Sequence, residues 1–135
     1  MGNCREVKVL GGLNVRSVNS VNELNIPIKH KRFIEQYLNN IRKFDCLSKV
    51  FLFGSCAKET ATSNSDVDLF LLTKQKIPED IEFSIIFDSI PTVAEGYIKN
   101  DVLLKSEAEY NQYKDAVGMV QKAIEAEGVD LSGLL

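Results

Sequence analysis

Two apolar runs, separated by a glycine turn and a polar segment, constrain this chain more than any other feature. The first run, "KVFLF", covers residues 49–53 and stops at Gly54-Ser55. The second run, "VDLFLL", covers residues 67–72. Apolar runs of this length that end at turn residues are typical of strands buried inside a sheet. We therefore expect two buried strands, with a tight turn after the first.

The patterns around these runs predict helices packed on a sheet. Apolar residues recur at three- and four-residue spacing from Phe33 to Phe44, which predicts an amphipathic helix of about four turns. The later segments are predicted as a strand at 81–87, a short helix at 92–100, a short strand at 101–104 and a final helix at 107–128. Since strands and helices alternate, the expected fold class is α/β (α+β), a small mixed β-sheet with helices packed on it.

Length and composition favour a single domain. A chain of 135 residues with 44% hydrophobic composition can bury a core without disulfides. We expect residues 27–135 to form one domain and residues 1–26 to be a leader that could form a hairpin. The net charge of -3 gives no sign of a nucleic-acid or membrane surface. Three cysteines without a CxxC pair, and no secretory signal, predict a cytoplasmic protein.

Asp66 and Asp68 stand at the start of the second run. Residues two apart on a strand face the same side, so these carboxylates would lie side by side and repel each other. A hard cation such as Mg²⁺ relieves that repulsion and keeps positions for phosphate oxygens. Because the Gly54-Ser55 turn lets a phosphate approach the backbone, the segment predicts phosphoryl or nucleotidyl transfer. The alternative is an Asx-type turn, with Asp66 as a cap and Asp68 solvated.

The same residues resemble a known family. An apolar strand, Gly54-Ser55, ten residues and then Asp66-Val67-Asp68 are similar to the signature of the DNA polymerase β-like nucleotidyltransferase superfamily. Within it, the short chain looks like the minimal nucleotidyltransferase (MNT) domains that act as antitoxins beside HEPN-type toxins. The resemblance implies the polymerase β-like fold, Mg²⁺ as the cofactor, and ATP or another nucleoside triphosphate as the substrate.

The resemblance also implies roles for individual residues. Asp66 and Asp68 would be catalytic and would ligate Mg²⁺. The nucleotide would be held by Gly54, Ser55, Lys58 and Ser65. Lys58 stands where the family often has Arg, and a lysine contacts phosphate as a point charge without the two-pronged geometry of Arg.

Active relatives usually carry a third acid on a strand beside the two aspartates. Alignment with the expected strand at 81–87 puts Ser84 in that place, and a serine is neither a strong metal ligand nor a base. Glu82 or Asp88, on the same face of that strand, would reach the site only in a shifted register.

Two functions follow. The first is an adenylyltransferase-type enzyme that moves AMP from ATP to a hydroxyl on a protein or small acceptor, which in the antitoxin branch is a tyrosine of the HEPN toxin. The second is a nucleotide-binding module, weak or inactive in catalysis, that regulates a HEPN-type partner by contact. Ser84 favours the second, and the intact Gly-Ser and Asp-Val-Asp residues favour the first. Because the domain is small, a partner or a second copy could complete the site.

Two other residues are expected to have no catalytic role. His30, the single histidine, lies in a basic helix start and is predicted to be a surface residue. Cys56 would lie near a helix N-terminus, where the pKa of a thiol can fall, but the sequence offers it neither a second histidine nor a resolving cysteine nearby.

Overall fold

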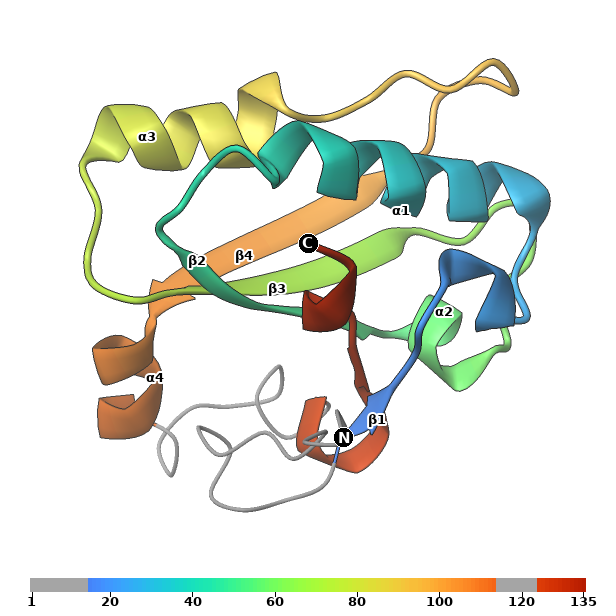
Figure 1. Cartoon of the computed structure of the whole chain (residues 1–135). Helices are drawn as coiled ribbons and strands as arrows, with labels where there is room; N and C mark the ends of the chain where they lie inside the picture. Colours follow the sequence, from blue (N-terminus) through green and yellow to red (C-terminus); the bar gives the residue numbers. More distant parts are fainter. Residues whose placement is uncertain (1–14, 114–123) are drawn as a thin grey trace.

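The computed structural model describes residues 15–113 and 124–135. Within these residues, five strands form one mixed sheet with helices on both faces (Figure 1). In spatial order the strands are β1 (Arg16–Ser17), β5 (Val129–Asp130), β2 (Leu47–Phe53), β3 (Val67–Thr73) and β4 (Asn100–Ser106). The two apolar runs lie in β2 and β3, so both predicted buried strands and the α+β fold class are confirmed.

The register of the central strands brings three chain segments to one end of the sheet. β3 runs antiparallel to β2 and parallel to β4. Phe53, the last residue of β2, pairs with Asp68, and Asp68 pairs on its other side with Asp101 of β4. The carboxyl end of β2 therefore meets the amino ends of β3 and β4. This arrangement places the Gly-Ser turn beside the two aspartates.

One face of the sheet is covered by α1 (Ile28–Ile41), which lies above the central strands in Figure 1. Its buried apolar residues, each at most 2% exposed, are Phe33, Ile34, Tyr37, Leu38 and Ile41. Burying a side chain of this size stabilises a fold by about 1.5–3 kcal/mol. The predicted amphipathic helix is thus confirmed, although it ends at Ile41.

The opposite face of the sheet carries a smaller core. Phe51 and Phe70 pack there with Tyr110 of α4 (Glu107–Tyr113). Since neighbouring strand residues alternate between faces, Phe51 enters this core while Val50 enters the core under α1. Both faces of β2 and β3 therefore bury apolar side chains, which explains why their sequences are continuously apolar.

The prediction of a strand at 81–87 is wrong, because this segment is helical. Glu79–Phe83 form α3, and Ser84–Asp88 continue it as a π-helix. Isoleucines four residues apart suit a helix, and acidic residues fill its first turn, where they interact favourably with the helix dipole. The Tyr37 hydroxyl donates a hydrogen bond of 2.7 Å to the Ile85 carbonyl, which anchors the π-helix to α1.

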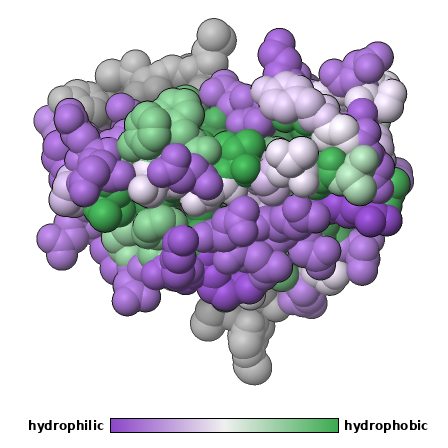
Figure 2. Space-filling view, turned by 90° about the horizontal axis from the view of Figure 1, so that it is seen from above, coloured by the Kyte–Doolittle hydropathy of each residue, from purple (hydrophilic) through white to green (hydrophobic). Residues whose placement is uncertain are grey.

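Phe83 and Phe87 lie on the outer side of this helix and form the Phe83–Phe87 patch. Their exposed fractions are 55% and 61%, and their ring centroids are 4.7 Å apart. Figure 2 looks down on the face that carries α1 and α3. Apolar side chains gather on its left, the side on which α3 lies in Figure 1.

The segment that leads into β4 is also different from its prediction. Residues 92–100 form a loop with one bridge between Val93 and Gly96, so the short helix expected there is wrong. Gly96 has a φ of 120°, which is not helical, and β4 begins at Asn100, within the predicted helix. The strand predicted at 101–104 is confirmed within β4.

The two ends of the chain are described only in part. β1 pairs in parallel with β5, but residues 1–14 lie outside the described residues, so the leader hairpin stays a prediction. The predicted final helix is described as α4 and as a helical turn at 124–127, and its centre also lies outside them. None of the helices in the described ranges combines the length and apolarity that a membrane span needs.

Candidate active site

Gly54 forms the turn between β2 and the short helix α2 (Ser55–Lys58). Its φ of 75° and ψ of -157° lie in a region that is essentially restricted to glycine. A Cβ at this position would also collide with the Asp68 carboxylate. The site therefore requires glycine for two reasons, its backbone conformation and its close approach to Asp68.

Three aspartates gather beside this turn. Asp66 immediately precedes β3, Asp68 is its second residue, and Asp101 is the second residue of β4. Asp68 and Asp101 are partners in the parallel register, and neighbouring strands lie about 4.7–4.9 Å apart. Asp66 and Asp68 are half-buried, whereas Asp101 is exposed.

These aspartates act on one another electrostatically. The pKa of Asp68 is raised, first by burial and then by the negative charges of Asp66 and Asp101. Within the described residues, no lysine or arginine forms an ion pair with any of the three. Their repulsion is thus left for water or a bound cation to relieve.

Ser84 does not lie on a strand beside the two aspartates, where the alignment predicted it. Ser84 lies in the π-helix and donates to Asp88 at 3.4 Å, and neither residue belongs to the strand beside β3. The strands beside β3 are β2 and β4, and β4 carries Asp101 in register with Asp68. The sequence does carry a signal for it: "NDVLL" repeats the pattern of "SDVDL", in which an aspartate opens an apolar strand.

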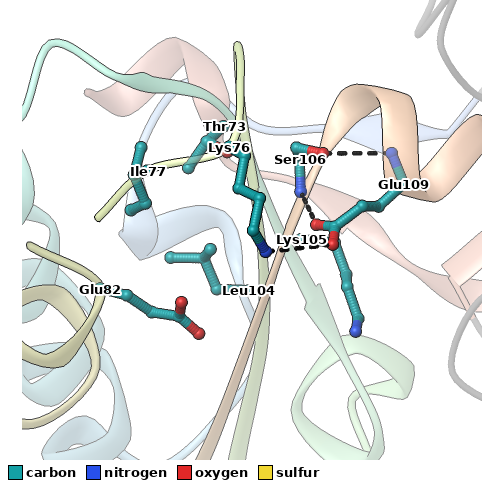
Figure 3. Close-up of a pocket in the computed structure, with 8 residues that line it drawn as sticks. All are labelled: Thr73, Lys76, Ile77, Glu82, Leu104, Lys105, Ser106 and Glu109. Carbon is teal, nitrogen blue, oxygen red and sulfur yellow. Dashed lines mark hydrogen bonds and ion pairs between the residues drawn. The ribbon is translucent and has the colours of Figure 1, made fainter. Parts of the chain in front are cut away.

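Glu82, the other candidate for the third acid, lies at the far end of the strands. It lines a hollow of about 110 Å³ together with Thr73 and Ser106, the last residues of β3 and β4 (Figure 3). Five residues of strand separate Thr73 from Asp68, a span of about 16 Å. A shift in register therefore does not bring Glu82 to the aspartates.

The hollow in Figure 3 has a structural explanation. Ser106 and Glu109 cap α4 reciprocally, because the Ser106 N–H donates to Glu109 Oε1 at 2.9 Å and the Glu109 N–H donates to Ser106 Oγ at 3.1 Å. Lys76 Nζ lies 3.7 Å from Glu109 Oε2. The Ser106 N–H, the strongest influence, lowers the pKa of Glu109. Ser106 and Glu109 are therefore explained by their capping of the N-terminus of α4.

The three aspartates carry the type of oxygen ligand that a hard divalent cation takes. Among the described residues, no three Asp, Glu, His or Cys side chains are already grouped closely enough to hold a metal ion. However, Asp68 and Asp101 are register partners, and Gly54, which lacks a Cβ, lets the Asp68 carboxylate lie directly against the turn. Carboxylate oxygens are the ligands that Mg²⁺ and Ca²⁺ prefer. To surround one ion, the three aspartate side chains would have to rotate toward one another.

The pKa of the Cys56 thiol is raised, whereas a position near a helix N-terminus can lower it. The Cys56 side chain is fully buried, and burial, then Asp68 and Asp66, raise the pKa of the thiol to about 12. The thiol lies 3.5 Å from the Asp66 carbonyl, to which it donates. Cys56 is therefore neither a nucleophile nor a thiolate ligand at neutral pH.

His30 is not a surface residue, so that prediction is wrong. Its side chain is fully buried, and its Nε2 atom lies 2.8 Å from the Ser65 carbonyl oxygen. The basic residues around it suggested an exposed helix start, but His30 faces inward toward the segment that precedes β3. The spacing of four residues to the buried Ile34 is the signal that could have shown this.

Lys58 and Ser65 are engaged within the protein. Lys58 Nζ lies 4.0 Å from Glu127 Oε1 in an exposed ion pair. Ser65 Oγ accepts the Thr62 N–H at 2.8 Å and closes the turn before Asp66. Their roles in nucleotide binding stay predictions.

Glu59 caps α2 with a left-handed φ of 62°. Its carboxylate lies 3.5 Å from Arg16 Nη1 and accepts the Asn25 N–H at 3.2 Å, while Arg16 Nη2 also donates to the Ala57 carbonyl at 3.2 Å. Residues of the leader thus hold the helix that follows the Gly-Ser turn.

Most of the chain matches a known protein family. The family model "Polymerase beta, Nucleotidyltransferase" matches residues 34–131, well over half of the chain. A solved structure from Sulfolobus solfataricus, provisionally named as a nucleotidyltransferase, is 19% identical, with 70% of this chain and 81% of that chain covered and a TM-score of 0.48. The search of curated proteins found no match. The matched range contains the Gly-Ser turn and all three aspartates, and the chain therefore belongs to the polymerase β nucleotidyltransferase family.

Proposed function

We propose that this chain transfers a nucleoside monophosphate, with AMP from ATP as the first candidate, to a hydroxyl acceptor in a Mg²⁺-dependent reaction. The observation that carries the proposal is the register of Asp68 with Asp101, beside Asp66 and the Gly54 turn. In this proposal Asp101 takes the part of the third carboxylate, for which the sequence alignment offered Ser84.

Each residue has a distinct part in this reaction. Asp66, Asp68 and Asp101 would hold the cation, which when bound supplies positive charge to the phosphate oxygens. Gly54 lets the triphosphate approach the backbone. The acceptor oxygen attacks the α-phosphorus, the bond from that phosphorus to the bridging oxygen breaks, and pyrophosphate leaves. We assign to Asp101 the proton of the attacking hydroxyl, because it is the most exposed of the three carboxylates.

A second candidate is a nucleotide-binding module that regulates a HEPN-type partner by contact alone. Its argument from the sequence was Ser84 in the place of a third acid, and the first proposal answers that argument with Asp101. One observation favours it: the Phe83–Phe87 patch exposes two large aromatic side chains, and such patches are typical of protein contact surfaces. The pairing with a HEPN toxin rests on the resemblance of the sequence.

Labelling with [α-³²P]ATP separates the two candidates. The full chain, Mg²⁺ and the candidate partner are incubated together, and the partner is expected to carry the label. Asp66→Asn with Asp68→Asn should abolish labelling, whereas Glu82→Gln is the matched control and should keep it. Labelling that survives the double substitution contradicts the site. If the wild type binds Mg-ATP and the partner but transfers no label, the contact module is the better description.

A further inference from the structure

The backbone around Asp66 is held by groups from distant parts of the chain. The Ser65 carbonyl accepts a hydrogen bond from His30 of α1, and the Asp66 carbonyl accepts one from Cys56 of α2. The Val67 N–H then donates to the Lys99 carbonyl at 2.9 Å, where β3 meets the segment before β4. Three successive residues are thus fixed from three directions.

His30 makes the shortest of these contacts. A carbonyl oxygen can only accept, so the hydrogen must lie on Nε2 of the ring. Nδ1 is buried and has no partner among the described residues. A buried nitrogen without a partner is unfavourable, and an apolar side chain could fill the same space without that loss. The histidine is therefore best explained by what its Nε2–H does to the Ser65 carbonyl.

We propose that His30 is a positioning residue for the acidic site. Through the Ser65 carbonyl it fixes the peptide that carries Asp66, and so sets the distance between the Asp66 carboxylate and Asp68. Cys56 holds the next peptide through the Asp66 carbonyl. This inference rests on the proposed function in one respect, that the aspartates bind a cation.

A direct test measures amide hydrogen exchange in the full chain. His30→Leu removes the donor, while His30→Gln keeps an N–H donor at similar reach. In His30→Leu the Val67 amide should exchange about 10-fold faster or more, because the hydrogen bond that holds the preceding peptide is lost. The amides of Phe70 and Leu71, in the middle of the same strand, should be unchanged, and His30→Gln should restore the Val67 rate to near that of the wild type.

Other exchange results overturn the inference. If all amides of β3 accelerate equally in His30→Leu, the residue serves overall stability and does not position the site. An unchanged Val67 amide also contradicts the proposal. Should His30→Leu fail to fold, Cys56→Val compared with Cys56→Ser repeats the experiment at the next peptide, whose carbonyl Cys56 holds. The expected acceleration of Val67 amide exchange is smaller, because a thiol is a weak donor.

Mn²⁺ binding, measured by electron paramagnetic resonance, tests whether the position of the peptide that carries Asp66 matters to the cation affinity of the aspartates. His30→Leu should weaken Mn²⁺ binding about 10-fold, and His30→Gln should recover most of it. If the wild type binds no Mn²⁺, the proposed function fails, while the exchange experiment still decides whether His30 holds the peptide. Local acceleration at Val67 together with unchanged Mn²⁺ affinity shows that the peptide is held but that its position does not matter to the cation, which overturns the positioning role.

Discussion

Replacing Gly54 by alanine is the smallest change that tests how the turn and the acids fit together. The substitution adds one methyl group in a backbone conformation that side chains avoid, at φ 75° and ψ -157°. The same methyl group would meet the Asp68 carboxylate, its Cγ and its Cβ. The Asp68 side chain is short, so it relieves this clash by rotating its carboxylate away from its place between Asp66 and Asp101.

The two effects have separate magnitudes. A non-glycine residue in this backbone region costs about 1–3 kcal/mol. Inserting a methyl group into a filled space costs about 1–3 kcal/mol more. The sum, about 2–6 kcal/mol, is a large part of the 5–15 kcal/mol of a typical domain, so Gly54→Ala should be strongly destabilised. Because Asp68 is displaced, Mn²⁺ affinity should fall about 10–100-fold.

Gly96→Ala is the matched control. Gly96 also has a positive φ, of 120°, but a Cβ there meets nothing within 4 Å. Its substitution should carry only the backbone cost and should leave Mn²⁺ affinity unchanged. Urea unfolding and Mn²⁺ titration of both variants measure the difference. Equal losses of stability, together with wild-type Mn²⁺ affinity in Gly54→Ala, would refute the close fit between the turn and Asp68.

Other parts of the structure give further predictions. Because burial and the neighbouring aspartates raise the pKa of Asp68, the folded chain binds this proton more tightly than the unfolded chain, and stability should fall as pH rises from the ordinary value of 3.8 through the raised one. Asp68→Asn should flatten that part of a urea-unfolding pH profile and be more stable than the wild type at neutral pH; an unchanged profile contradicts this. Glu59→Gly should stabilise an Arg16→Gln background by about 1 kcal/mol, because it relieves the left-handed φ where the ion pair is already lost and the one other contact of the carboxylate among the described residues is an exposed hydrogen bond from the Asn25 N–H. A loss of stability would show that this hydrogen bond outweighs the backbone strain. Tyr37→Phe should cost about 1–3 kcal/mol in urea unfolding, since it leaves the buried Ile85 carbonyl without its donor, and no change would mean that the π-helix does not depend on this bond.

The elements with strong patterns could be predicted from the sequence. The stripe from Phe33 to Ile41 repeats at helical spacing, and the runs in β2 and β3 are apolar because both faces are covered. The Gly54 turn and the pair Asp66 and Asp68 were likewise visible, because each depends on residues close together in the chain.

The predictions that failed concern features that depend on contacts between residues far apart in the sequence. Over seven residues, "IEFSIIF" shows alternation typical of a strand and also a four-residue isoleucine spacing typical of a helix, and the hydrogen bond from Tyr37 to the Ile85 carbonyl accompanies the helix. That error put Ser84 on a strand beside the two aspartates, because the neighbour of β3 was taken from the wrong segment. The burial of His30 followed the same rule, since it depends on the carbonyl of Ser65, which lies 35 residues away.

The central claim is that Asp101 completes a cation site with Asp66 and Asp68. Mn²⁺ titration in the presence of a non-hydrolysable ATP analogue tests it most directly, with Asp101→Asn compared against Asp88→Asn. Both variants remove one exposed carboxylate, so their net charge is the same. Asp101→Asn should weaken Mn²⁺ binding about 10-fold or more, and Asp88→Asn should match the wild type. Wild-type affinity in Asp101→Asn, or a loss confined to Asp88→Asn, would contradict the account.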